Sequence, residues 1–106
     1  MKRGELQVEL PDGTIIKRSV SADTFADAVN EAIARCGIEN VVNAANKAKG
    51  GKPLISNVPS DYAKYRNMKE LKIEGWYVDT DSSNIWKKEL LEKIFNELEL
   101  PWKVSI

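Results

Sequence analysis

The sequence contains no histidine and only one cysteine, Cys36. Without histidine, the chain lacks the commonest general base and the commonest metal ligand of proteins. A single cysteine excludes an intrachain disulfide and, with no histidine partner, Cys–His catalysis. Cys36 also falls on the apolar side of a predicted helix, which is typical of a buried small hydrophobic residue. These absences predict a protein that is not an enzyme and that has no metal and no small-molecule cofactor.

The chain also lacks a long apolar run and an excess of charge of either sign, with 16 basic and 16 acidic residues. No segment approaches the ~18 apolar residues of a membrane-crossing helix. The first residues, MKRGELQVEL, contain no apolar core of a secretory signal. The length of 106 residues predicts one domain, 1–106. We therefore expect a cytoplasmic protein with no membrane partner, and the lone cysteine fits a reducing compartment.

Alternating and β-branched segments predict the strands. Leu6, Val8 and Leu10 alternate with polar residues, and the turn sequence PDG follows directly. The segment TIIKRSV then completes a β-hairpin. Further strands are predicted for PLISNV at 53–58, for LKIEGWYVDTD at 71–81 and for WKVSI at 102–106.

Residues 21–36, SADTFADAVNEAIARC, have the apolar spacing of a helix. Ser21 or Asp23 is expected to cap its start, and Gly37 is a natural residue to follow its end. Residues 39–45, ENVVNAA, fit either a short helix or a strand.

A second helix is predicted within SSNIWKKELLEKIFNELEL, 82–100, which carries a broad apolar stripe. Its N-cap is expected from Asp81, Ser82 or Ser83, and Pro101 ends it. The three tryptophans, Trp76, Trp86 and Trp102, fall on apolar faces and are predicted to lie in the core.

The order of these elements, β-β-α-β-β-α-β, predicts an α+β fold. We expect a mainly antiparallel sheet of about five strands with two helices packed on one face.

Two short motifs bear on ligand chemistry. DTDSSN at 79–84 lacks the glycine and glutamate positions of a calcium loop, which favours a helix cap over a metal site. KAKGGK at 47–52 lacks the G-x-x-x-x-G-K-[ST] pattern of a nucleotide-binding loop. A looser backbone nest for one phosphate group stays open there.

Residues 46–72 form the most unusual part of the sequence, with seven basic and two acidic residues. Two acidic flanks surround this basic region, and such asymmetry is an argument about partners. On a helical turn Tyr62, Tyr65 and Lys69 would share one side and offer a stacking or phosphate-binding surface. We therefore predict a non-catalytic accessory domain that associates with nucleic acid, DNA rather than RNA, through a basic loop. The predicted contacts are Lys47, Lys49, Lys52, Tyr62, Lys64, Tyr65, Arg66, Lys69 and Lys72.

The alternative is a protein-interaction or self-association module. The predicted β-hairpin and the predicted strand that Pro53 and Pro59 bracket are both expected to expose sheet edges. An exposed edge of this kind can accept a strand from a partner protein.

Several segments together resemble a known kind of domain. The turn PDGTII, the helix start DTF, the strand GWYV and the helix start DSS, all as they stand in this sequence, mark the similarity. The chain resembles a small α+β domain appended to bacterial restriction–modification and related defence proteins. The resemblance covers the two ends of the chain and implies an accessory role in binding DNA or a partner protein.

Overall fold

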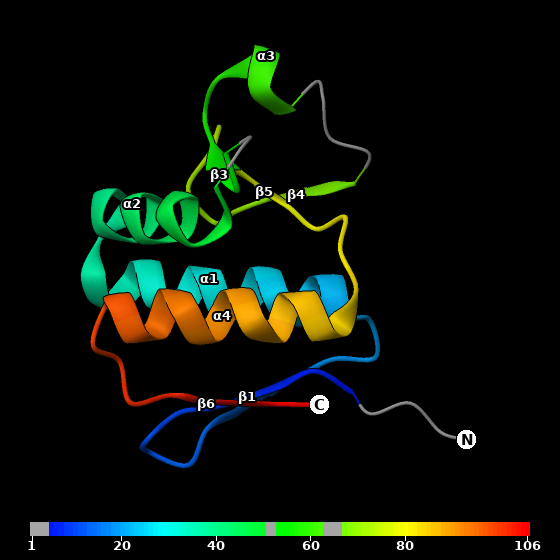
Figure 1. The fold of residues 1–106 in the computed structure, drawn as a ribbon, viewed down its shortest axis with the longest axis vertical. Helices are drawn as coiled ribbons and strands as arrows, with labels where there is room; N and C mark the ends of the chain where they lie inside the picture. Colours follow the sequence, from blue (N-terminus) through cyan, green and yellow to red (C-terminus); the bar gives the residue numbers. More distant parts are fainter. Residues whose placement is uncertain (1–4, 51–52, 63–66) are drawn as a thin grey trace.

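Three long helices lie between two small sheets in the computed structural model (Figure 1). The structure describes residues 5–50, 53–62 and 67–106. Its helices are α1 (Ser21–Cys36), α2 (Ile38–Lys49), α3 (Pro59–Tyr62) and α4 (Asn84–Glu97). Its strands are β1 (Gln7–Glu9), β2 (Ile15–Lys17), β3 (Ile55–Ser56), β4 (Met68–Glu70), β5 (Tyr77–Asp79) and β6 (Lys103–Ser105).

The predicted hairpin is confirmed as β1 and β2. In its turn the Leu10 N–H donates to the Thr14 carbonyl at 2.9 Å, and Gly13 adopts a φ of 91°. Strand β6 pairs with the other side of β1, so the first sheet has the order β2-β1-β6 and is antiparallel throughout. Val8 lies opposite both Ile16 and Val104. These three side chains share the face that α1 and α4 cover.

The second sheet has the order β3-β5-β4 and is also antiparallel. The segment 71–81, predicted as one strand, contains the turn of the β4–β5 hairpin as well as β5. Gly75 has a φ of 84°, and its N–H donates to Glu70 Oε2 at 3.1 Å. The Leu71 N–H donates to the Trp76 carbonyl at 2.8 Å and closes the turn.

The α+β class and the antiparallel pairing are confirmed, whereas the single sheet of about five strands is wrong. Residues 38–49 form helix α2, which directs the chain to the far side of α1 and α4 before β3 begins (Figure 1). Val41, Ala44 and Ala45 form the buried stripe of α2. Because alanine side chains are small, α2 can pack closely on its two neighbours. The strands are thereby divided between two sheets, and more than two helices form the centre.

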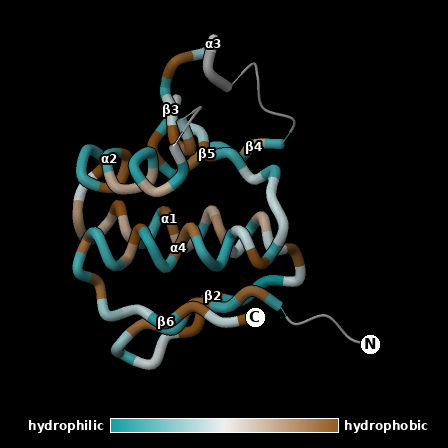
Figure 2. Tube along the Cα trace, in the orientation of Figure 1, coloured by the Kyte–Doolittle hydropathy of each residue, from teal (hydrophilic) through white to brown (hydrophobic). Residues whose placement is uncertain are grey.

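The helices bury their apolar faces against one another. Along α1 and α4 hydrophobic residues alternate with hydrophilic ones at helical spacing (Figure 2). Phe25 and Val29 of α1 and Leu91 and Ile94 of α4 are at most 1% exposed. In the described part of the chain, no helix has the length and apolar character needed to cross a membrane.

The helix caps follow the predictions in part. The Ser83 hydroxyl accepts a hydrogen bond from the Trp86 N–H at 3.2 Å, which confirms the predicted cap of α4. Helix α1 instead has Val20 at its N-cap, without a side-chain cap bond. Of the predicted core residues, Trp102 is buried, Trp86 is 37% exposed, and Cys36 is half-buried at the edge of the core.

Helix α4 ends in a Schellman motif built on a non-glycine residue. The Leu100 N–H donates to the Phe95 carbonyl at 2.8 Å, and the Glu99 N–H donates to the Asn96 carbonyl at 3.1 Å. This motif requires a left-handed conformation at Glu99, whose φ is 56°. A side chain with a Cβ is disfavoured there.

We expect Glu99→Gly to raise the free energy of unfolding by about 1 kcal/mol, because glycine adopts this conformation without the Cβ clash. Glu89→Gly is the matched control within α4 and should lower the same quantity by about 1 kcal/mol. Urea denaturation followed by circular dichroism measures both. A destabilised Glu99→Gly variant would contradict the assigned strain.

Candidate functional site

The structure disperses the predicted nucleic-acid contacts over several elements. Lys47 and Lys49 belong to the last turn of α2 and not to a loop, while Tyr62 ends α3. Lys69 lies in β4, so the predicted single helical side shared with the tyrosines is wrong for this residue. Lys72 follows β4 in the hairpin turn. The predictions for Lys52, Lys64, Tyr65 and Arg66 lie outside the described residues.

Three of the predicted lysines form ion pairs within the protein. Lys47 pairs with Glu97 of α4 at 3.0 Å, and both side chains are largely exposed. Lys69 pairs with Asp23 of α1. Lys49 pairs with Asp79 of β5 at 2.6 Å, and these side chains are only 16% and 5% exposed. Part of the positive charge counted in residues 46–72 is therefore balanced by acids from other parts of the chain.

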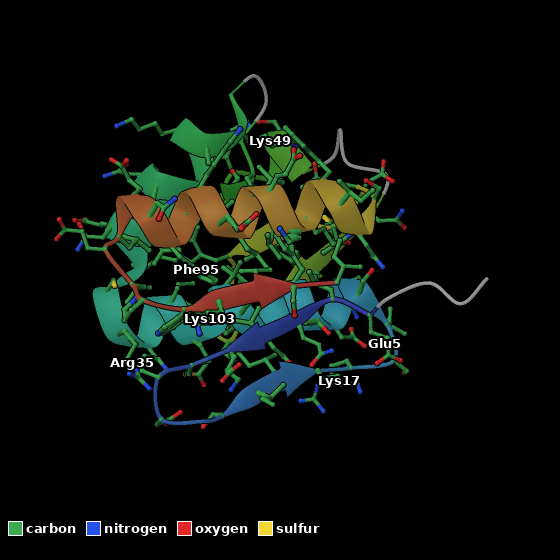
Figure 3. The ribbon with its side chains drawn as sticks, turned by 60° about the horizontal axis from the view of Figure 1, so that its bottom comes forward. Glu5, Lys17, Arg35, Lys49, Phe95 and Lys103 are labelled. Carbon is green, nitrogen blue, oxygen red and sulfur yellow. The ribbon has the colours of Figure 1, made fainter. Side chains whose placement is uncertain are left out.

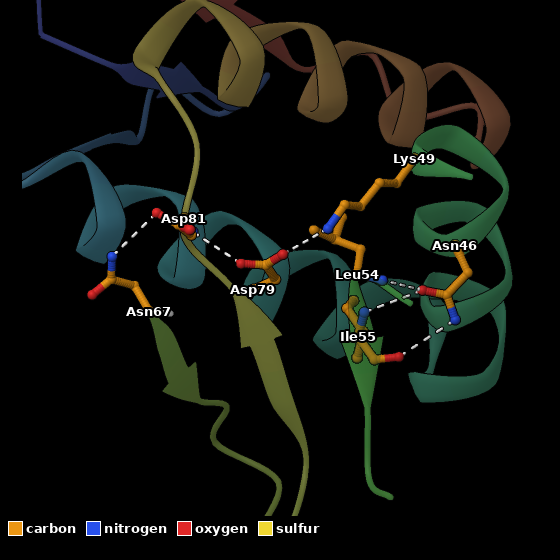
Figure 4. A network of polar contacts seen from close by, with 7 residues as sticks. All are labelled: Asn46, Lys49, Leu54, Ile55, Asn67, Asp79 and Asp81. Atoms are coloured by element: carbon orange, nitrogen blue, oxygen red, sulfur yellow. Dashed lines mark hydrogen bonds and ion pairs between the residues drawn. The ribbon is translucent and has the colours of Figure 1, made fainter. Parts of the chain in front are cut away.

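The Lys49–Asp79 pair belongs to a polar network between α2, the second sheet and the start of α4 (Figure 4). Asp79 Oδ1 accepts a hydrogen bond from the Asp81 N–H at 3.0 Å, and Asp81 Oδ1 accepts one from Asn67 Nδ2 at 3.3 Å. The arrangement leaves the buried carboxylate of Asp79 with both a cation and a backbone donor. It connects elements that are distant in sequence, which is a structural role.

Lys87, on the buried side of α4, faces the same network. Its side chain is almost fully buried, and its ammonium donates to the Ser82 carbonyl. Burial lowers the pKa of Lys87 from its usual value, and the negative charges of Asp79 and Asp81 oppose this shift.

Asn46 closes the outer edge of β3. Its Oδ1 accepts from the N–H groups of Leu54 and Ile55 at 2.8 and 3.1 Å, and its Nδ2 donates to the Ile55 carbonyl at 3.4 Å (Figure 4). The side-chain amide therefore bonds the strand backbone as a neighbouring strand would. Leu54 and Ile55 are each 1% exposed, so water cannot replace these bonds.

We expect Asn46→Ala to lower the free energy of unfolding by about 2–3 kcal/mol, because it leaves two buried N–H groups without acceptors. The control is Asn40→Ala, which removes an exposed hydrogen bond to the Cys36 carbonyl. It should change stability by less than about 0.5 kcal/mol. Equal effects of the two substitutions in urea denaturation would contradict the role given to Asn46.

The aspartates of DTDSSN therefore serve the polar network, and Ser83 serves as the cap. Among residues 5–50, 53–62 and 67–106, no three histidine, cysteine, aspartate or glutamate side chains are grouped to hold a metal ion. In the described part of the chain, the DTDSSN residues that carry polar contacts therefore have structural roles, in the network and in the cap of α4.

Among the residues that the structure describes, no strand pairs with the side of β6 that faces away from β1. The Leu10 N–H donates to the Thr14 carbonyl and so points toward β2, and the direction of the backbone groups alternates along an antiparallel strand. Val8 therefore directs its backbone groups toward Ile16 of β2, and its two neighbours in β1 direct theirs toward β6. By the same alternation, the N–H and carbonyl of Val104 point away from β1, toward the open edge.

A groove of about 460 Å³ runs beside this edge. In Figure 3, α4 runs alongside β6 on the side away from β1. The helix therefore forms one wall of the groove and the strand forms the other. Trp102 packs edge-on against Phe95 with ring centroids 5.0 Å apart, and both contribute to the lining. Glu92 and Asn96 line the groove from α4.

The sequence predicts exposed sheet edges at the hairpin and at 53–58, and it does not predict the one at β6. The β6 groove depends on pairing between the two ends of the chain, which no local pattern reveals. The alternation of Trp102, Val104 and Ile106 was the one sequence signal in this region.

Comparison of the chain with protein-family models, curated proteins and solved structures finds no match. The resemblance to accessory domains of bacterial defence proteins therefore stays a prediction.

Proposed function

We propose that this chain is a non-catalytic protein-interaction module that accepts an extended segment of a partner protein at the open edge of β6. The observation that carries the proposal is the groove between β6 and α4. A partner strand would hydrogen-bond to the outward N–H and carbonyl of Val104, as in other strand additions. Every second side chain of the partner strand would point into the groove, toward α4.

The wall formed by α4 favours a single extended segment as the occupant. A second copy of the chain, paired edge to edge through β6, would bring its own α4 beside this one. Neighbouring strands lie about 4.8 Å apart, whereas the axes of packed helices need 8–10 Å. Edge-to-edge pairing would therefore force the two copies of α4 too close together. A lone segment brings no helix layer and avoids this conflict.

The edge of β6 provides a sharp test through proline substitution. The Val104 N–H points away from β1, so Val104→Pro removes a donor for the partner and keeps the β1–β6 ladder. The matched control is Ile15→Pro, since Ile15 directs its N–H to the opposite edge of the sheet by the same alternation. Peptides selected on the wild-type chain from a phage-displayed library of random ten-residue sequences serve as probes.

We expect Val104→Pro to weaken binding of the selected peptides at least tenfold and Ile15→Pro to leave it nearly unchanged, as measured by isothermal titration calorimetry. Circular dichroism checks that both variants are folded. Failure to select any peptide, or equal losses in the two folded variants, would sink the proposal.

Nucleic-acid association is the second proposal, supported by the seven basic and two acidic residues of 46–72. Lys72 is exposed, whereas Lys47, Lys49 and Lys69 already form ion pairs with carboxylates of other elements. These carboxylates would compete with phosphate groups for the lysines, so nucleic-acid association is the second proposal.

If the chain binds duplex or single-stranded DNA through this region, log K should fall against log salt with a slope of about −4. Lys64→Glu combined with Arg66→Glu should weaken binding, while Lys17→Glu combined with Lys103→Glu, both in the first sheet, makes the same change of net charge away from residues 46–72. Fluorescence anisotropy over a salt series measures the slope. A slope near zero would contradict this second proposal.

A further inference from the structure

The charges that line the β6 groove lie on different faces of the sheet. Glu9 and Lys103 are direct cross-strand partners and project to the outer face, opposite to Val8 and Val104. Their opposite charges balance each other there. Glu92 approaches from α4, on the inner side, and is exposed.

The inner side of the groove therefore combines apolar residues with one amide, Asn96, and one carboxylate, Glu92. Phe95, Trp102 and Val104 supply the apolar surface. Lys88 pairs with Glu92 Oε1 at 3.0 Å, and an exposed helix pair of this kind holds its two side chains only weakly. A carboxylate has further acceptor positions, so Glu92 can accept a second cation from a ligand.

A cation of α1 lies over the Trp102 ring, outside the groove lining, whereas the carboxylate of Glu92 belongs to the lining. The Arg35 guanidinium stands 5.9 Å from the centre of the Trp102 ring, and Trp102 lies at the start of the strand. Glu92 precedes Phe95 by about one helical turn, and α4 runs opposite to β6 (Figure 3). Glu92 is thereby displaced from Trp102 toward the later residues of β6, away from Arg35.

From this arrangement we infer that the partner segment carries apolar side chains on its inward face, followed on the same face by a lysine or arginine that binds Glu92. This inference rests on the proposed strand addition and specifies its ligand. The stem of a lysine would cover the aromatic surface while its ammonium reaches the carboxylate.

Two synthetic peptides test the inference, acetyl-KTVTVTK-amide and acetyl-ETVTVTE-amide. In each, two valines and both terminal charged residues share one face, and the symmetric pattern suits either strand direction. We expect the wild-type chain to bind the lysine peptide at least fivefold more tightly in calorimetric titrations at low salt.

Substitutions of α4 separate charge recognition from strand addition. Glu92→Lys should reverse the preference, and Glu92→Gln should remove most of it. Glu89→Lys, an equal change of charge on the same helix outside the groove lining, should leave the preference as in the wild type.

Equal affinity for both peptides, with binding lost in Val104→Pro, overturns this inference and leaves the proposed function standing. A preference that persists in Glu92→Lys also overturns it. Absence of binding by both peptides overturns the inference, and the phage selection then decides separately on strand addition.

Discussion

Burial of the helix faces is the constraint on which the rest of this structure depends. Each strand that the structure describes has at most three residues, and such short strands are not stable without a hydrophobic layer to cover them. Val8 of the first sheet and Val78 of the second are both fully buried. The two sheets do not pair with each other, so each is held by its contacts with the central helices.

The parts that the sequence predicted correctly are those encoded locally. The PDG turn, the periodicity of 21–36 and the serine cap of α4 each depend on neighbouring residues. The division into two sheets depends instead on α2, whose buried stripe contains two alanines and one valine. Alanine carries a weak hydrophobic signal, so ENVVNAA fitted two structures equally well. Pairing of β6 with β1 joins residues almost a chain length apart.

The charges of residues 46–72 also depend on contacts that the local sequence does not reveal. A count along 46–72 gives an excess of cations, but the sequence does not reveal which acids lie near them. Asp79 is thirty residues from Lys49, and Glu97 is fifty residues from Lys47. These separations explain why a basic segment need not produce a basic surface. For the residues that the structure describes, the charge of the surface depends more on ion pairs formed in three dimensions than on the count of charges along the segment.

The outer edges of the two sheets differ, and this difference is the physical basis of the strand-addition proposal. At β3, the Asn46 amide occupies the backbone groups that a partner strand would need. At β6, the outward groups of Val104 have no strand beside them in the described part of the chain, and α4 limits which partners can approach. Open edges ordinarily promote association between sheets. A helix along the edge opposes the approach of another layered sheet while leaving room for one extended segment, which is the arrangement that the strand-addition proposal requires.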